Sequence, residues 1–183
     1  GVTIVTFKLL SKAALALAAM GLCLSAASAA YKSEYKLSVV PGASSGWGQT
    51  ATFFADCVRQ KSNGRINIKP YFGAQLMAGK QTSELLLVRR GAIDFALAST
   101  INWSPQIKEL NLTALPFFVA NNPDRYKAID AIEAGKSGKM LEKAIEKTGV
   151  KFLGWSENGF RELTTSKGPI EKPEDMKGMK LRV

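Results

Sequence analysis

The segment Ile93–Ala98, with the sequence IDFALA, is the feature that most constrains the fold of this chain. All of its residues except Asp94 are apolar, and turn-forming residues flank it, with Gly91 before it and Ser99 after it. A short, nearly continuous apolar run of this kind is typical of a strand that is buried on both faces of a parallel sheet. Parallel sheets are built from strands that alternate with helices along the chain.

The rest of the chain shows this alternation of strand and helix patterns. Alternating apolar and polar residues predict further strands at residues 35–40, 65–71, 150–156, 160–166 and 179–183. Helical spacing of apolar residues predicts helices at residues 47–62, 79–90, 124–132 and 136–147. Residues 110–119, with LPFF at their centre, are interpreted as a connection between two halves. This order predicts an α/β fold of right-handed βαβ units, in which ligands bind beyond the carboxyl ends of the strands.

The beginning of the chain has the pattern of a secretory signal peptide. Two lysines precede an apolar run from Ala13 to Leu24, and the small residues 27–29 resemble a cleavage site. The run is shorter than the roughly 20 apolar residues that a membrane-spanning helix needs. We therefore expect residues 1–29 to be removed on export and the mature protein to begin near Ala30.

The composition argues against several kinds of site. The chain has no histidine, the commonest general base and metal ligand, and Cys57 is the only cysteine after the signal peptide. Zinc sites built from cysteine and histidine are therefore excluded, and no cofactor is expected. The net charge of +10 is scattered along the chain, whereas nucleic-acid-binding proteins concentrate their basic residues in a patch. The charge favours small anionic ligands or an acidic partner surface over nucleic acid.

Two arginines near the end of the chain are candidate anion receptors. Arg161 lies in the sequence NGFREL and Arg182 in MKLRV, so apolar residues flank both. A guanidinium group can form two parallel hydrogen bonds to a carboxylate. An ion pair with Asp175 remains an alternative for Arg182. Arg161 can instead support the site, paired with Glu157.

Several small, amide or aromatic residues follow the ends of the predicted strands. They are Trp47 after the first strand, Ala98, Ser99 and Trp103 after the third, and Asn158 after the fourth. They contain no catalytic constellation, and we expect them to line a ligand site. Two alternatives remain open, because tryptophans commonly serve packing and Ser99 or Asn102 can cap or turn the chain.

Five motifs occur in a fixed order along residues 35–183. They are GRINIKPYFGAQL at 64–76, RRGAIDFALAS at 89–99, LPFF at 115–118, GVKFLGWSENGFRELTTSKGPI at 149–170 and PEDMKGMKLRV at 173–183. In this order they resemble the solute-binding proteins of tripartite ATP-independent periplasmic (TRAP) transporters, the DctP-like family.

The resemblance implies a two-lobed periplasmic binding protein fold, with residues 30–119 as the first lobe and residues 120–183 as the start of an incomplete second lobe. It implies a monomeric periplasmic receptor, not an enzyme, that closes around an organic acid such as a C4-dicarboxylate. The receptor would deliver this carboxylate to TRAP membrane permease subunits driven by an ion gradient. Because the chain begins with Gly1 and ends within a predicted strand, we expect it to be an N-terminal fragment.

The resemblance also implies roles for individual residues. In the family, the arginine of the KxR segment pairs with the ligand carboxylate, and here that residue is Arg182. The arginine of the NGxR motif, here Arg161, is a second anion contact or an orienting group. The loop Gly42–Trp47 and the pair Ala98–Ser99 line the opposite wall in the family. Some members, including sialic-acid binders, have an acidic residue where Ser99 stands, so Ser99 favours a simpler monocarboxylate or dicarboxylate.

Two other classes of protein remain open. A periplasmic binding protein of an ABC transporter would share the two-lobed architecture but not the ordered motifs. An exported α/β enzyme would need catalytic groups from outside this chain, since no histidine is present.

Overall fold

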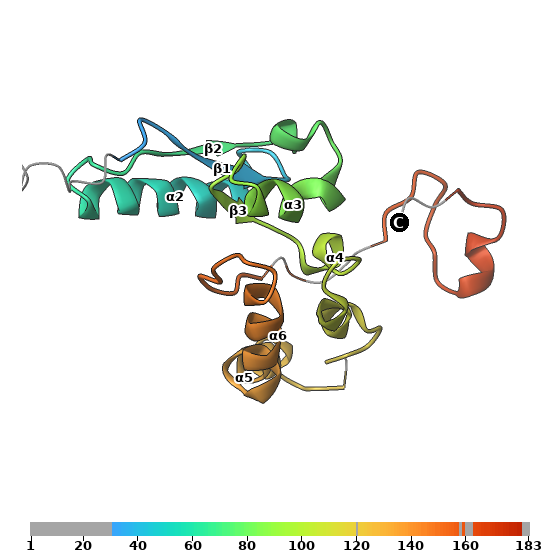
Figure 1. Cartoon of the computed structure of the whole chain (residues 1–183). Coiled ribbons are helices and arrows are strands. Elements are labelled where there is room, and N and C mark those ends of the chain that lie inside the picture. The colour runs from blue at the N-terminus through green and yellow to red at the C-terminus, as the bar shows by residue number, and fades with distance from the viewer. Residues whose placement is uncertain (1–30, 120, 158, 160–162, 181–183) are drawn as a thin grey trace, which may run out of the picture. The chain divides into compact units, whose positions relative to one another are not determined.

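The structure is a computed structural model that describes residues 31–119, 121–157, 159 and 163–180 (Figure 1). The chain divides into two units, one ending at Phe152 and the other beginning at Leu153. The expected signal peptide lies outside the described residues, as do parts of the strands expected at 160–166 and 179–183.

The first unit is built around a parallel sheet. In the described residues this sheet has the strand order β2-β1-β3, with β1 at Tyr35–Val39, β2 at Ile68–Tyr71 and β3 at Phe95–Leu97. The helices of the unit are α2 (Gly46–Lys61), α3 (Glu84–Arg89), α4 (Thr100–Trp103), α5 (Arg125–Ala134) and α6 (Lys136–Glu146). Short 3₁₀ segments occupy Gln75–Met77, Gln81–Ser83 and Lys108–Ala114.

Strand β1 is the centre of the sheet and pairs in parallel with both neighbours. Leu37 lies opposite Pro70 of β2 on one side and opposite Phe95 of β3 on the other. Because the three strands run in the same direction, their carboxyl ends meet at one edge of the sheet. The predicted α/β architecture is therefore confirmed for this unit.

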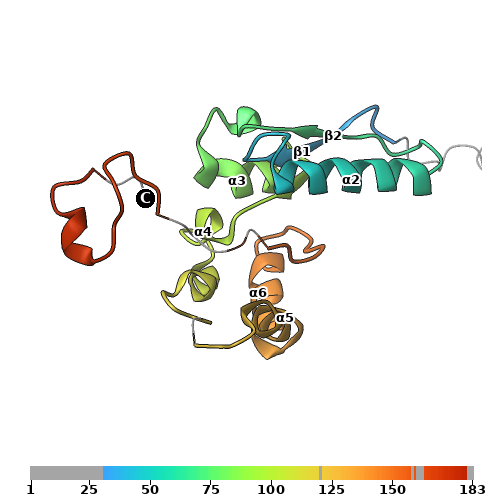
Figure 2. The same cartoon turned by 180° about the vertical axis from the view of Figure 1, so that it is seen from behind.

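The hydrophobic core lies between the sheet and α2, which runs alongside β1 and β2 (Figures 1 and 2). Leu37 and Val39 of β1 and Ile68 of β2 pack with Ala51 and Ala55 of the helix. These small alanines on the inner face of α2 bring the helix close to the strands.

Both ends of α2 follow from local sequence. At its start, the Ser45 side chain accepts a hydrogen bond from the backbone N–H of Gly48 at 3.1 Å, which satisfies a donor that the helix leaves unpaired. At its end, Asn63 and Gly64 adopt left-handed conformations with φ of 52° and 76°. The Gly64 N–H then bonds the Arg59 carbonyl oxygen at 2.8 Å, as is usual where a helix stops at glycine.

The substitution Gly48→Ala tests the close approach of α2 to the preceding loop. A Cβ atom on Gly48 would lie 2.4 Å from the Ala43 carbonyl oxygen, so we expect the free energy of unfolding to fall by about 1–3 kcal/mol. Gly46→Ala is the matched control, because nothing lies within 4 Å of its added Cβ atom. Urea denaturation should leave this control unchanged or slightly more stable; equal losses at the two positions would contradict the argument.

One expected helix is shorter than predicted, and expected strands near the end of the chain are absent from the described residues. The helix expected at 79–90 begins later, because Gly79 has a φ of 79° that a right-handed helix cannot contain; a 3₁₀ turn precedes α3. The strand expected at 150–156 does not form, and no strand lies at 163–166 or 179–180. Alternation supplies an apolar face, but a strand also needs a paired neighbour. The sheet in the described residues contains only β1, β2 and β3.

Strand β3 also differs from the expectation that Ile93–Ala98 is buried on both faces. It lies at an edge of the described sheet, and Phe95, Ala96 and Leu97 are only half-buried. Ile93, which precedes the strand, is 2% exposed and belongs to the core. Within the described residues, Phe95 and Leu97 are partly buried against the core.

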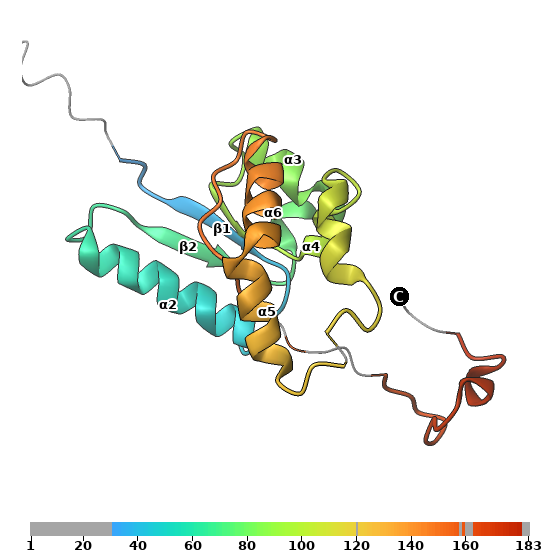
Figure 3. The same ribbon diagram turned by 90° about the horizontal axis from the view of Figure 1, so that it is seen from below.

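The predicted helices at 124–132 and 136–147 are confirmed as α5 and α6, which pack against each other (Figure 3). Asp124 caps α5 by accepting a hydrogen bond from the Lys127 N–H at 3.0 Å. Leu141, Ala144 and Ile145 form the buried side of α6. None of the helices in the described residues combines the length and apolar character needed to cross a membrane.

The second unit contains one 3₁₀ turn, Pro173–Met176, among its described residues. The Asp175 carboxylate accepts hydrogen bonds from the backbone N–H groups of Glu171 and Lys172, at 3.1 and 3.2 Å. Asp175 thus has a local role in shaping this turn.

Candidate functional site

The carboxyl edge of the sheet in the first unit brings three loops together. The loop after β2 is tied to the chain after β1, because the Gly73 N–H bonds the Pro41 carbonyl oxygen at 3.1 Å and the Ala74 N–H bonds that of Val39 at 3.4 Å. The third loop, Ala98–Ser99, follows β3 on the other side of β1. This edge is where an α/β fold binds ligands.

The structure places four of the predicted site residues next to this edge. Trp47 lies in the first turn of α2 and is half-buried against the core. Ala98 and Ser99 are half-buried between β3 and α4, and Trp103 is the last residue of α4. Ser99 occupies the N-cap position of α4, but its side chain makes no capping hydrogen bond.

The remaining predicted site residues are Asn158, Arg161 and Arg182. All three lie outside the described residues. Their assignment to the ligand site stays a prediction that rests on the motifs in which they occur.

Trp103 is anchored to a buried carboxyl group that the sequence analysis did not single out. Its side chain is 8% exposed, and its indole N–H donates to Oε2 of Glu84 at 3.1 Å. Oε1 of the same carboxyl group accepts a hydrogen bond from the Ser38 hydroxyl at 2.6 Å. Glu84 is 0% exposed and Ser38 is 1% exposed, so β1, α3 and α4 meet at one buried polar cluster.

Burial raises the pKa of Glu84, because removal from water disfavours the charged form. The hydrogen bonds from Ser38 and Trp103 act in the opposite direction and stabilise the carboxylate. The sequence offered only a weak signal for this residue. An acidic side chain in the first turn of a helix is ordinarily explained by the helix dipole, and only the apolar residues at 87 and 88, on the same side of α3, suggested burial.

The raised pKa of Glu84 predicts how stability depends on pH. The folded protein holds the proton more tightly than the unfolded chain, so this contribution to stability is complete below the unfolded-state pKa. It is lost as the pH rises through the folded-state pKa. We therefore expect the unfolding free energy of wild type, minus that of Glu84→Gln, to decrease as the pH is raised above about 4.5. Urea denaturation of both proteins across this range measures the difference, and a difference that increases with pH would refute the assignment.

The segment around α4 makes further side-chain bonds to the residues that precede α3. Asn102 Nδ2 donates to Gln81 Oε1 at 2.7 Å, and Gln106 Nε2 donates to the Thr82 carbonyl oxygen at 2.7 Å. The Trp103–Glu84 bond is the buried member of this set. Three side-chain hydrogen bonds therefore hold the α4 region to residues 81–84.

Residues 42–46 spell GASSG, which matches the G-x-S-x-G pattern of a serine nucleophile elbow between a strand and a helix. The third position is Ser44, which is exposed. The neighbouring Ser45 hydroxyl is used locally, because it donates to the Gly42 carbonyl oxygen at 2.6 Å and caps α2. A serine nucleophile needs a nearby base, usually histidine, and this chain has none.

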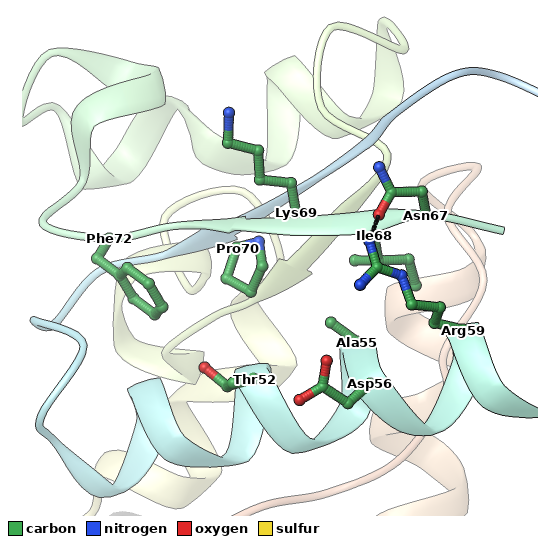
Figure 4. Close-up of a pocket in the computed structure, with 9 residues that line it drawn as sticks. All are labelled: Thr52, Ala55, Asp56, Arg59, Asn67, Ile68, Lys69, Pro70 and Phe72. Carbon is green, nitrogen blue, oxygen red and sulfur yellow. Dashed lines mark hydrogen bonds between the residues drawn. The ribbon is translucent and has the colours of Figure 1, made fainter. Parts of the chain in front are cut away.

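A surface pocket lies between α2 and the edge strand β2 (Figure 4). Its wall includes Thr52 and Asp56, and Arg59 spans it to donate to Asn67 Oδ1 at 3.0 Å. Lys69 points away from the helix. Trp47, Ala98, Ser99 and Trp103, the predicted site residues that the structure describes, do not line this pocket. Among the described residues, no group of three or more cysteine or acidic side chains is placed to hold a metal ion.

Comparison with solved structures defines the class of fold. The chain matches a TRAP periplasmic solute-binding protein from Ralstonia eutropha H16 with bound (S)-2-acetolactate, at 56% identity and a TM-score of 0.78 over 84% of this chain and 48% of that one. It also matches a TRAP periplasmic solute-binding protein from Sulfitobacter sp. NAS-14.1 with bound β-D-galacturonate, at 28% identity and a TM-score of 0.71 over 82% and 48% of the two chains. These matches confirm the predicted fold class, that of the two-lobed periplasmic binding proteins.

Residues 37–183 match the family model described as bacterial extracellular solute-binding protein, family 7 (DctP), and the chain belongs to this family. The 2,3-diketo-L-gulonate-binding periplasmic protein of Escherichia coli K12 is 30% identical over 70% of this chain and 38% of its own length. The C4-dicarboxylate-binding protein of Bacillus subtilis 168 is 30% identical over 81% of this chain and 41% of its own length. The chain thus spans about two fifths to one half of the length of these four relatives. These relatives are named as binding proteins, not as enzymes.

Proposed function

We propose that the protein is the periplasmic solute-binding protein of a TRAP transporter and that it captures a small organic acid without chemical conversion. The observation that carries this proposal is the 56% identity to a TRAP binding protein that holds (S)-2-acetolactate. The carboxyl edge of the sheet agrees with it, because the small and aromatic residues Ala98, Ser99, Trp47 and Trp103 lie next to it. The alternative of an exported enzyme would need a base for Ser44 other than a histidine of this chain, and no specific observation favours it or an ABC-type receptor.

The proposed ligand class is a short organic acid, either a hydroxy or keto acid or a C4-dicarboxylate. Bound (S)-2-acetolactate in the Ralstonia protein and succinate in a TRAP binding protein from Sulfurospirillum deleyianum, which is 25% identical, are both small carboxylates. Ser99 supplies a neutral polar group on this wall instead of a carboxylate. A ligand with an amine would require an anionic side chain on this wall. A neutral wall therefore favours a small acid without an amine.

We propose Arg182 as the carboxylate anchor, on the strength of its place in the KxR segment, and Arg161 as a second anion contact or an orienting group. Trp47, Ala98, Ser99 and Trp103 contribute one wall, and Asn158 is a further contact. A guanidinium fork fits a carboxylate through two parallel bonds. Exclusion of water on closure strengthens such a pair.

We further propose that residues 1–29 are a cleaved signal peptide, that residues 30–119 belong to the first lobe and that residues 120–183 begin the second. The receptor would act as a monomer in the periplasm and deliver its ligand to the membrane permease subunits of the transporter. The positive net charge of the chain is compatible with an anionic ligand.

A thermal-shift screen of the intact protein against organic acids of two to six carbons tests the ligand class. A ligand that binds only the folded state stabilises it by about 2.7 kcal/mol at a concentration of one hundred times its dissociation constant. We expect (S)-2-acetolactate or a close relative to raise the melting temperature, and neutral polyols of the same size to leave it unchanged. Stabilisation by polyols or amines instead of acids would argue against the proposal.

A further inference from the structure

We propose that Glu84 is a positioning residue for ligand binding, because it is the shared hydrogen-bond acceptor that fixes the segment Ala98–Trp103 against the end of β1. The inference rests on the proposed function and adds a residue that lies behind the ligand-facing wall. Glu84 itself is not expected to touch the ligand, since it is 0% exposed.

The geometry makes one carboxyl group the link between three elements. Ser38 is followed by Val39, the last residue of β1, and the loop that leads to Trp47 begins directly after Val39. Trp103 ends α4, four residues after Ser99. Both side chains donate to Glu84, at 2.6 and 3.1 Å. The two segments proposed to line the ligand are therefore joined through a single buried group.

A carboxyl group can accept a hydrogen bond from both neighbours at once. Both neighbours are neutral donors, and the carboxylate offers one oxygen to each. A glutamine would keep one oxygen for the Trp103 N–H, which can only donate, but the Ser38 bond would have to reverse, with the amide NH₂ donating to the hydroxyl. A leucine would satisfy neither donor. Since burying a carboxyl group without a balancing charge is unfavourable, its presence here points to a need for both hydrogen bonds.

The surrounding contacts strengthen this assignment. The Asn102–Gln81 and Gln106–Thr82 bonds also hold the α4 region to residues just before Glu84. These two bonds are closer to the surface, where water can replace them, whereas the Trp103–Glu84 bond is buried. Loss of the buried bond should therefore release α4 more than loss of either outer bond.

The test is calorimetric titration of the intact protein with (S)-2-acetolactate at a temperature well below unfolding. Removing one partner of a buried hydrogen bond typically changes a folding or binding equilibrium constant by about tenfold or more. We expect Trp103→Phe, which keeps an aromatic ring but removes the N–H, and Glu84→Gln each to weaken binding by about tenfold. Glu84→Leu should weaken it more. The double variant Trp103→Phe/Glu84→Leu should lose less than the product of the two single losses, because both substitutions remove the Trp103–Glu84 bond. Glu109→Gln, at an exposed carboxyl group, is the matched control and should bind as wild type does.

A spectroscopic readout separates positioning from a purely structural role. The indole N–H signal of Trp103 is identified by its absence from the ¹⁵N-correlation spectrum of Trp103→Phe. We expect this signal to move in Glu84→Gln and to move again when wild type is saturated with the acid. If Glu84→Leu does not fold, Trp103→Phe still measures the same link.

Wild-type affinity in both Glu84→Gln and Trp103→Phe, with only their stability reduced, would overturn the inference and leave the proposed function intact. The inference would also be overturned if the indole N–H signal of Trp103 did not shift when the acid is added. Failure of the wild-type protein to bind the acid would instead overturn the proposed function, and this inference with it.

Discussion

The substitution Arg182→Ala in the intact protein is expected to weaken binding of (S)-2-acetolactate by at least a hundredfold. Arg182 stands in the KxR segment at the end of the PEDMKGMKLRV motif, and its proposed role is that of the carboxylate anchor. Removing one partner of a buried charge pair typically costs about 3–5 kcal/mol, because the other charge is left uncompensated. Each 1.4 kcal/mol corresponds to about tenfold in affinity. Calorimetric titration measures the change.

Two companion variants make this result specific. Arg182→Lys keeps the charge but loses the planar fork, so it should bind more weakly than wild type and more tightly than Arg182→Ala. Arg161→Ala should have a smaller effect, since its proposed role is that of a second contact. Near-wild-type affinity of Arg182→Ala would exclude Arg182 as the anchor. A larger loss from Arg161→Ala would transfer that role to Arg161.

Leu85→Ala is expected to lower the free energy of unfolding by about 2–5 kcal/mol, the usual cost of emptying a well-packed leucine site. Leu85 is 0% exposed in α3. Its neighbour Leu86, at 36% exposed, provides a control with the same chemistry. Leu86→Ala should cost less than about 1 kcal/mol, because much of its side chain already meets water.

Urea denaturation of the two alanine variants measures this contrast. Equal losses in unfolding free energy at the two positions would show that the Leu85 side chain does not pack in the core. A small loss at Leu85 alone would show that the site collapses around the missing side chain. The expected ratio of the two losses in unfolding free energy depends on the burial of the two leucines. It therefore holds whether or not the protein binds an organic acid.

The parts of the fold that sequence predicts well are those governed by local signals. Helix α2 has a serine cap, a stripe of small apolar residues and an Asn-Gly stop, and its observed bounds differ from the prediction by one residue at each end. The β1 strand and helices α5 and α6 also follow from periodicity alone. In each case the residues that shape the element lie within it or next to it.

The buried cluster at Glu84 was beyond such reasoning, because it depends on contacts between distant residues. Ser38 and Glu84 are 46 positions apart in sequence, and Trp103 follows Glu84 by 19. The sequence left two roles open for the Trp103 side chain, which were packing and contact with the ligand. The structure shows it buried and bonded to Glu84, next to the segment that is proposed to line the ligand.

The strand expected at 150–156 shows a second limit. Its sequence, VKFLGWS, alternates well enough to suggest a strand, yet its described residues form none. Alternation states which side chains would share a face, but only pairing with a neighbour creates a ladder. Asn158, Arg161 and Arg182 lie outside the described residues, and their assignment to the site rests on their motifs.

The central claim is that the protein binds an organic acid through its carboxylate. The most direct measurement is calorimetric titration of the intact protein with (S)-2-acetolactate and, in parallel, with its uncharged methyl ester. The account predicts saturable binding of the acid at one site and no measurable binding of the ester, since the ester cannot pair with a guanidinium group. Equal affinity for the two compounds, or binding of neither this acid nor any other small carboxylate, would contradict it.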